Sequence, residues 1–264
     1  MKQTKQQFRT HISFSELKIW DECPFKHKLV YLEKVKEFKG NEHTAFGTAM
    51  HYVCENMFDQ DNNLEKLFDK KFIEELTLLK EIEYKLNTSL VTSMRKQGKA
   101  MLSFILPHLK KTFPSFKIVS VEESLMEPLA KDLSFKGYID LVIKTPDNKY
   151  HVIDWKTCSW GWNTKRKTDR MTTYQLTLYK HFFAKKHSID PKQIETHFAL
   201  LKRTAKKDNV EIFCVTSGPK KIENVLKLLD KAVYNIKNKI FIKNRVSCTE
   251  GYGCEFFNTK FCTR

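Results

Sequence analysis

In the first part of the chain, apolar residues recur at the spacing of amphipathic helices. Leu17 and Trp20 begin one such stripe, with Ser13 or Ser15 as its N-cap, and Pro24 predicts a break or kink within it. The same spacing predicts helices over residues 15–32, 44–58, 64–86 and 89–109. This helical half contains no nucleotide-binding signature.

The pattern changes at Phe116, after which β-branched and aromatic residues form short runs. Three runs predict a meander of strands, and the turn Pro146-Asp147-Asn148 divides the last two. The runs predict strands over residues 117–125, 133–145, 149–157, 195–203 and 209–217, with helices over 172–186 and 219–239. This order of elements predicts an α+β fold (α/β-type).

No repeat, low-complexity segment or linker rich in proline, glycine or serine divides the sequence. We therefore expect one domain over residues 1–264. Its parts would be a helical elaboration over 1–115, a sheet-and-helix core over 116–217, and a C-terminal helix with a cysteine-bearing tail over 218–264.

The composition narrows the class of protein. The 264 residues are 41% hydrophobic and 12% aromatic, which is enough to bury a core and excludes wholesale disorder. A formal charge of +16 suggests a polyanionic partner such as a nucleic acid. The alternative is that the many lysines reflect an AT-rich genome or serve solubility alone.

The sequence offers no feature of a membrane protein. Its longest uncharged apolar run, residues 100–109, is far shorter than the ~20 residues of a membrane span. The first residues are basic, but Glu16 and Lys18 interrupt the stretch where a signal peptide would be apolar. We expect a soluble intracellular protein that is cytoplasmic (in the host cytoplasm if the source is viral) and has no membrane partner.

Seven cysteines are an odd number and argue against a framework of disulfides. Three of them stand alone within regular segments and are predicted to be buried, inert thiols; these are Cys54, Cys158 and Cys214. The remaining four lie near the two ends of the chain, at Cys23, Cys248, Cys254 and Cys262. That distribution is typical of a ligand set.

Two carboxylates and a lysine fall on the central hairpin. Asp154 and Lys156 share one face of their strand because side chains alternate with period two, and the neighbouring strand can bring Asp140 beside them. Converging carboxylates suit Mg²⁺ or Mn²⁺, and a nearby lysine can polarise a water or neutralise charge on a phosphate. Taken alone, the spacing favours a surface ion pair.

The surrounding residues resemble the PD-(D/E)XK nuclease superfamily, and within it the RecB-like exonucleases, including CRISPR-associated and AddB-type members. The matching motifs, in family order, are Ser13-Phe14-Ser15 with Cys23-Pro24, Gly47-Thr48-Ala49-Met50-His51, Gly137-Tyr138-Ile139-Asp140, Asp154-Trp155-Lys156-Thr157 and Gln175-Leu176-Thr177-Leu178-Tyr179. The chain departs from the pattern at Ile139, where the family has proline. The resemblance implies a restriction-endonuclease-like core with a central mixed sheet.

The resemblance also implies roles for residues. The metal ligands would be His51, Asp140, Asp154 and the main-chain carbonyl of Trp155, and the catalytic residues Asp140, Asp154, Lys156, Gln175 and Tyr179. A lone histidine is more often part of a core, and Gln175 with Tyr179 could be a polar-aromatic helix surface. Either Glu122 or Glu123 could supply a further acid, and the spacing does not decide between them.

RecB-like nucleases often hold a [4Fe-4S] cluster with one upstream and three C-terminal cysteines, which here would be Cys23, Cys248, Cys254 and Cys262. The usual C-terminal spacing is C-x2-C-x5-C, and Gly251 stands where its second cysteine would be. Four thiolates could equally hold Zn²⁺, and unligated tail cysteines are the remaining alternative.

The expected function is that of a metal-dependent DNA exonuclease acting on duplex ends or single strands in recombination, repair or phage or CRISPR-type processing. Recombination or helicase proteins would be its partners, since the chain has no P-loop motor of its own. The alternatives are a catalytically weak DNA-binding subunit of a recombination complex, and a structure-specific endonuclease or ribonuclease.

Overall fold

The computed structural model describes residues 10–35, 40–249 and 253–263. The chain forms two compact units. The central unit consists of Lys39–Ser124 and Tyr138–Ser217, and the terminal unit of Met1–Phe38, Leu125–Gly137 and Gly218–Arg264. The predicted single domain with its three parts is not tested by this division and stays a prediction.

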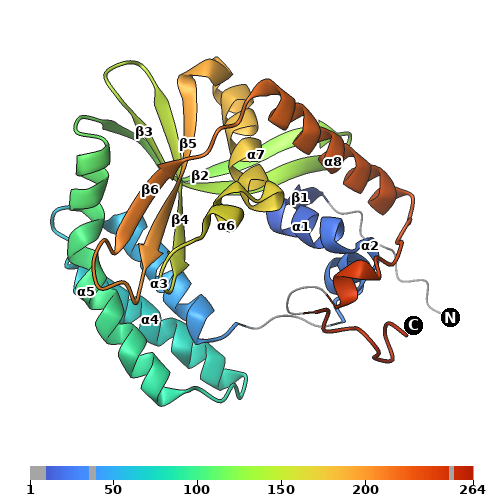
Figure 1. The fold of residues 1–264 in the computed structure, drawn as a ribbon, viewed down its shortest axis with the longest axis horizontal. Helices are drawn as coiled ribbons and strands as arrows, with labels where there is room; N and C mark the ends of the chain where they lie inside the picture. Colours follow the sequence, from blue (N-terminus) through green and yellow to red (C-terminus); the bar gives the residue numbers. More distant parts are fainter. Residues whose placement is uncertain (1–9, 36–39, 250–252, 264) are drawn as a thin grey trace. The chain divides into compact units, whose positions relative to one another are not determined.

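The central unit contains a mixed sheet, which confirms the predicted fold class (Figure 1). Its strands are β3 (Leu133–Lys144, from Tyr138 on), β4 (Tyr150–Cys158), β5 (Ile194–Lys202) and β6 (Val210–Cys214). β4 pairs antiparallel with β3 and parallel with β5, and β6 pairs antiparallel with β5. β2 (Lys117–Ala130) pairs with β3. A parallel pair needs a crossover, and the helices α6 (Thr164–Thr168) and α7 (Arg170–His187) supply it between β4 and β5.

Helices cover both faces of this sheet, α7 on one and α3, α4 and α5 on the other (Figure 1). The three are α3 (Glu42–Asn56), α4 (Leu64–Glu81) and α5 (Thr88–Thr112), and an asparagine side chain caps the start of each. Their apolar stripes bury Phe46, Phe68 and Phe72 in one aromatic group. Alternate residues of β4 therefore face different helices: Trp155 belongs to the core with α3–α5, whereas Asp154 meets α7.

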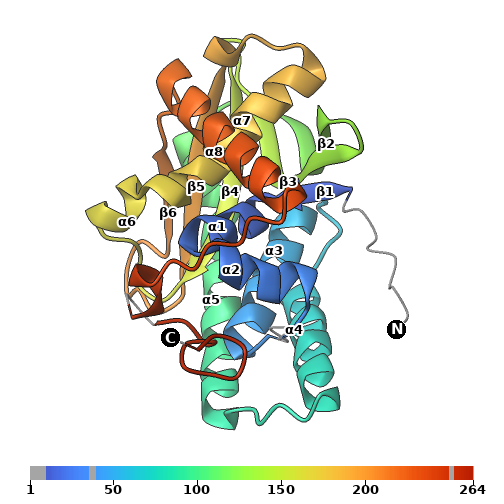
Figure 2. The same cartoon turned by 90° about the vertical axis from the view of Figure 1, so that its right-hand side faces the viewer.

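The terminal unit joins the two ends of the chain. β1 (His11–Ser13) pairs parallel with the beginning of β3, and α1 (Phe14–Glu22), α2 (Pro24–His27) and the π-helix η1 (Lys28–Leu32) follow. Ser13 caps α1, and the predicted break at Pro24 occurs where Cys23 takes an extended backbone. α8 (Pro219–Lys237) and the short η3 (Val246–Cys248) lead into the C-terminal segment, which lies against α2 (Figure 2).

Some elements differ from the sequence-based expectation. β1, α6 and the 3-10 turn η2 (Pro191–Gln193) are too short to show a period and were not predicted. α5 continues through Pro107 to Thr112, three residues past its predicted end. Among the described residues, no helix is long and apolar enough to cross a membrane.

Candidate active site

The β4 strand presents Asp154 and Lys156 on one face, as the alternation predicted. Lys156 Nζ lies 2.5 Å from Asp154 Oδ2, and Asp154 is only 2% exposed. Burial raises the pKa of Asp154, the charge of Asp140 adds to the rise, and Lys156 opposes it. Any additional positive charge close to this carboxylate would stabilise its ionised form.

Asp140 reaches the same place because β3 and β4 stop pairing at that point. The β3–β4 ladder ends at the pair Leu141 and Ile153. The next N–H group of β4 that points toward β3, that of Trp155, therefore has no backbone partner on β3. The carboxylate of Asp140 accepts that N–H, with 2.6 Å between Trp155 N and Asp140 Oδ2. The hydrogen bond fixes one oxygen of Asp140 and leaves the other, Oδ1, facing α3.

His51 comes from α3 on the opposite side of Asp140. Its Nδ1 lies 3.4 Å from Asp140 Oδ1. Burial opposes protonation, but the hydrogen bond and charge of Asp140 outweigh it and raise the pKa of His51. One turn earlier, a Cβ added at Gly47 would lie 3.4 Å from Thr157 Oγ1, at van der Waals contact, so α3 lies close to the end of β4 at this point.

Gln175 and Tyr179 extend the group from α7. They are four residues apart and share a helix face, as the spacing predicted. The amide of Gln175 donates to Asp154 Oδ1 at 2.9 Å and contacts Tyr179 Oη at 3.1 Å. Burial raises the pKa of Tyr179, so the phenol stays protonated at neutral pH.

The structure distinguishes the two glutamates that the sequence left open. Glu123 pairs with Lys186 at 2.5 Å and with His187 at 2.9 Å, away from the carboxylates. Glu122 has a left-handed backbone, φ 50°, which interrupts the regular alternation of β2. Burial and the charges of Asp140 and Glu55 raise its pKa to about 7.

Glu55 is a residue that sequence reasoning missed. It lies one helical turn after His51 on α3, and that spacing was the available signal. Burial raises its pKa, and it is within hydrogen-bonding reach of Glu122. Glu55 and Glu122 therefore add two carboxyls to the pair formed by Asp140 and Asp154.

This group fits a divalent cation. Four carboxyls with one histidine carry more negative charge than Lys156 neutralises, and the pKa values of Asp154, Glu55 and Glu122 are all raised. Carboxylate oxygens are the ligands that Mg²⁺ and Mn²⁺ prefer. The side chain of Trp155 is buried, and the proposed use of its main-chain carbonyl as a ligand stays a prediction.

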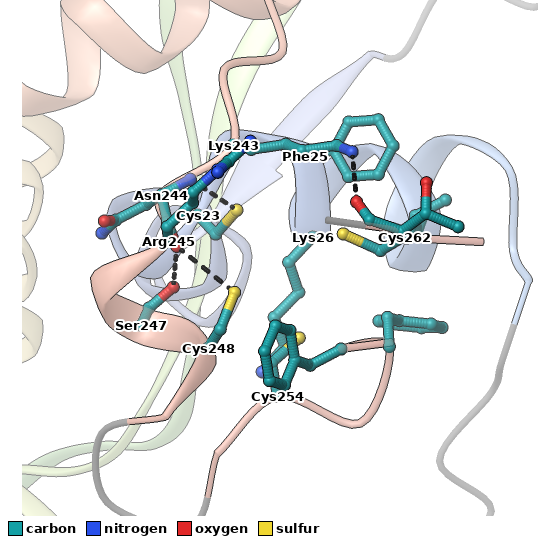
Figure 3. A pocket seen from close by; sticks show the side chains of 14 residues that line it. Cys23, Phe25, Lys26, Lys243, Asn244, Arg245, Ser247, Cys248, Cys254 and Cys262 are labelled. Atoms are coloured by element: carbon teal, nitrogen blue, oxygen red, sulfur yellow. Dashed lines mark hydrogen bonds between the residues drawn. The ribbon is translucent and has the colours of Figure 1, made fainter. Parts of the chain in front are cut away.

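The four predicted cluster cysteines come together in the terminal unit. Cys23, Cys248, Cys254 and Cys262 all line one cavity of about 320 Å³. Figure 3 shows them around a common space, with the sulfur atoms of Cys23, Cys248 and Cys262 turned into it. Slight burial and the three other thiols raise the pKa of Cys248, as closely spaced thiolates would.

Backbone hydrogen bonds hold this cysteine group. Asn244 N donates to Cys23 Sγ at 3.3 Å, and Cys254 N donates to the carbonyl of Cys248 at 3.1 Å. Lys26, Lys243 and Arg245 add positive charge to the cavity lining (Figure 3). Gly251, which replaces a cysteine of the usual spacing, lies outside the described residues.

The other three cysteines differ in exposure. Cys54 is buried as predicted, and Cys158 is half-buried. Burial was therefore predicted wrongly for two of the three: Cys158 is only partly buried, and the thiol of Cys214 is exposed. Cys214 ends β6, which is an edge strand with a neighbour on one side only.

Comparison with solved structures shows a similar fold in a protein of low sequence identity. The crystal structure of a protein from Eubacterium rectale described as a candidate exonuclease aligns with 95% of this chain and 92% of its own, at a TM-score of 0.59 and 15% identity. The structure of a protein named SSO0001 aligns with 83% of this chain and 85% of its own at 14% identity, with a TM-score of only 0.33.

Sequence comparison identifies the family. No curated protein matches the chain. The family model of the PD-(D/E)XK nuclease superfamily matches residues 11–258, which is nearly the whole chain. This range includes the acid Asp154, the base Lys156 and the amide Gln175. The predicted family is thereby confirmed: the chain belongs to the PD-(D/E)XK nuclease superfamily.

Proposed function

We propose that this nuclease is a DNA exonuclease that uses Mg²⁺ or Mn²⁺ and acts on DNA ends or single strands. Nucleases of the superfamily use divalent metal ions. The observation that carries the proposal is the convergence of Asp140, Asp154 and Lys156, with His51 on one side and Gln175 on the other. These groups come from two strands and two helices of the central unit.

The proposed roles follow from the contacts. Asp140, Asp154 and His51 would hold the cation, which when bound would supply positive charge for the phosphodiester and lower the pKa of water. Lys156 carries a positive charge 2.5 Å from Asp154, where it can orient a water or stabilise charge that develops on phosphate. Gln175 holds the orientation of Asp154, and Tyr179 in turn contacts Gln175.

One exposed tryptophan after β4 supports a single-stranded substrate. Trp160 is 79% exposed and lines the same surface depression as Arg166, whose guanidinium lies 4.5 Å from the centroid of the buried ring of Trp162. Exposed aromatic rings beside basic groups stack unpaired bases in a sequence-tolerant manner. The formal charge of +16 supports attraction to the phosphate backbone.

The test is cleavage of end-labelled single- and double-stranded DNA, linear and circular, with Mg²⁺ or Mn²⁺. An exonuclease shortens linear substrates from an end and leaves covalently closed circles intact. Cleavage of circles would instead support the endonuclease alternative, and RNA substrates test for a ribonuclease. Binding without cleavage in either metal would favour the alternative of a DNA-binding subunit, and Asp154→Asn is the control for contaminating nucleases.

We also propose that Cys23, Cys248, Cys254 and Cys262 hold a [4Fe-4S] cluster, with Zn²⁺ as the alternative. Two observations support a common ligand: the four cysteines line one cavity, and the other three thiols contribute to the raised pKa of Cys248. Protein purified without oxygen should be brown and contain about four irons per chain. Colourless protein with one zinc per chain would select the zinc alternative, and metal-free, stable protein would exclude both.

A further inference from the structure

A second group of potential ligands lies in the central unit, apart from the carboxylates. His151 is on β4, and Glu195 and His197 are on β5. The parallel register sets His151 beside Glu195, and the period of two puts His197 on the same face as Glu195. By the same period, His151 and Asp154 face opposite sides of β4, since they are three residues apart.

The three side chains converge on one point. His151 Nδ1 lies 3.0 Å from His197 Nε2 and 3.7 Å from Glu195 Oε2, and His197 Nε2 lies 4.0 Å from the same oxygen. In a tetrahedral zinc site with bonds of about 2.0–2.1 Å, ligand atoms are separated by roughly 3.3 Å. The observed separations lie within about 0.7 Å of that value, so side-chain adjustments alone can close the site.

Neighbouring groups leave two of these atoms, His151 Nδ1 and Glu195 Oε2, available to a metal ion. Thr145 Oγ1 donates to Asp147 at 2.5 Å, so it accepts from His151 Nε2 at 3.0 Å and leaves the lone pair of His151 on Nδ1. Lys149 occupies the other oxygen of Glu195 at 2.6 Å. Partners of this kind orient the ligands of known metal sites.

The surroundings also keep the histidines in the state that binds metal. Both are buried, and the ring of Phe113 packs on them at centroid distances of 4.7 and 5.3 Å. Burial, with the neighbouring His151, lowers the pKa of His197 to about 4, so its imidazole is neutral at pH 7. Without a metal, His197 Nε2–H donates to His151 Nδ1, so metal binding at His197 Nε2 moves this proton to His197 Nδ1.

We propose that His151 Nδ1, His197 Nε2 and Glu195 Oε2 form a binding site for Zn²⁺ or a similar transition-metal ion. Two imidazoles and a carboxylate suit Zn²⁺ and disfavour Mg²⁺, which prefers oxygen ligands and an octahedral geometry. The half-exposed side of Glu195 leaves a fourth position for water. The ion would join β4 to β5 three residues before Asp154, and this proposal does not rest on the proposed exonuclease activity.

The experiment is titration of the full-length protein with Co²⁺, followed by competition with Zn²⁺. Cobalt at this site should give visible absorption without the intense sulfur-to-cobalt band that the cysteine group would add. Glu195→Gln keeps the contact with Lys149 but removes the charged ligand, and His197→Gln removes a nitrogen ligand. Each should weaken Zn²⁺ binding at least about tenfold, as even outer-shell changes do in known sites.

Two controls keep the result interpretable. His181→Gln alters a histidine on α7 outside the group and should leave the affinity unchanged. Asp154→Asn should leave it unchanged as well, because the carboxylate site is separate. Absence of nitrogen- or oxygen-type cobalt absorption in the wild type, or equal Zn²⁺ affinity in Glu195→Gln and the wild type, would overturn the proposal. Zinc should also raise the unfolding temperature of the wild type more than that of Glu195→Gln.

Discussion

The carboxylate group of the central unit and the cysteine group of the terminal unit are built in different ways. Asp140 and Asp154 each have a protein donor, the N–H of Trp155 and the amide of Gln175, and both sit on regular elements. Within the described part of the chain, the hydrogen bonds of the cysteine sulfurs are with backbone groups, and three of the cysteines lie on irregular backbone or a short turn after α8. Protein contacts alone orient the first group, whereas we expect the second to become rigid when it binds a shared ligand.

The two groups also differ in the charges that surround them. The carboxylates repel one another, and His51 and Lys156 relieve part of that repulsion before any cation arrives. Slight burial and the other three thiols raise the pKa of Cys248, so a metal bound by this group would have to displace its proton. A metal at the first site should thus change activity more than stability, and at the second it should change stability first.

The largest expected effect is on the carboxylate group. Asp154→Asn should lower cleavage by at least about a hundredfold to a thousandfold, because it removes a charge where the cation and phosphate would meet. The unfolding temperature in chelator should fall little or even rise, since repulsion with Asp140 is relieved. Asp230→Asn, at an exposed position on α8, is the control. Wild-type rates in Mn²⁺ would place the chemistry elsewhere.

A substitution in the cysteine group should change stability more than cleavage activity. Cys23→Ser should remove the bound metal and destabilise the protein by about 3 kcal/mol or more, because a link from Cys23 to Cys248 closes most of the chain into a loop. Metal analysis and thermal unfolding measure both effects. Cys214→Ser, at an exposed thiol, should change neither. If Cys23→Ser unfolds at the wild-type temperature, the contrast between the two groups is lost.

Gln175 tests how far the carboxylate site depends on prior orientation. Gln175→Ala removes one hydrogen bond to Asp154, worth about 1 kcal/mol, and should slow turnover roughly fivefold. Tyr179→Phe keeps the ring but loses the contact with Gln175, so its effect should be smaller. Turnover rates at saturating Mg²⁺ give the comparison. An unchanged rate in Gln175→Ala would mean that Lys156 alone is sufficient to orient Asp154.

The smallest effect concerns pH. The pKa of Glu122 is about 7 in the folded protein and 4.5 ordinarily, so its contribution to stability falls as pH rises between these values. Glu122→Gln should therefore stabilise the metal-free protein at pH 8, by about 1 kcal/mol because solvent screens the half-buried carboxyl, and not at pH 4.

Glu123→Gln is the matched control for this experiment. Contacts with Lys186 and His187 lower the pKa of Glu123 despite burial, so its charge stabilises the fold above pH 4.5 and is lost on acidification. Glu123→Gln should therefore destabilise the protein at pH 8, whereas Glu122→Gln should stabilise it. Thermal unfolding in chelator at both pH values measures the two, and equal signs at pH 8 would contradict the assignment.

Local periodicity predicted those parts of the site that a single element supplies. Asp154 and Lys156 follow from the period of a strand, and Gln175 and Tyr179 from that of a helix. Glu55 could have been found in the same way, one turn from His51. The family resemblance supplied His51, whose position beside Asp140 depends on the packing of α3 against the sheet.

Other parts depend on pairing that one sequence does not reveal. Glu122 lies near Asp140 because its own backbone is left-handed within β2, and neither the hydrophobic pattern nor residue propensity indicates such a conformation. The group of His151, Glu195 and His197 exists because β4 and β5 pair in parallel with a particular register. The three-residue β1 is likewise held by its partner on β3 and has no pattern of its own.

The hydrogen bond from Trp155 N to Asp140 has a consequence for how such a protein can evolve. The carboxylate accepts a main-chain donor at the end of a ladder, so loss of the side chain would leave a buried N–H without a partner. A descendant that abandoned cleavage could replace Lys156 together with its partner Asp154, but would retain aspartate, or asparagine, at position 140. Among inactive relatives, an acid surviving there would be a trace of folding, and its presence alone would be poor grounds for inferring activity.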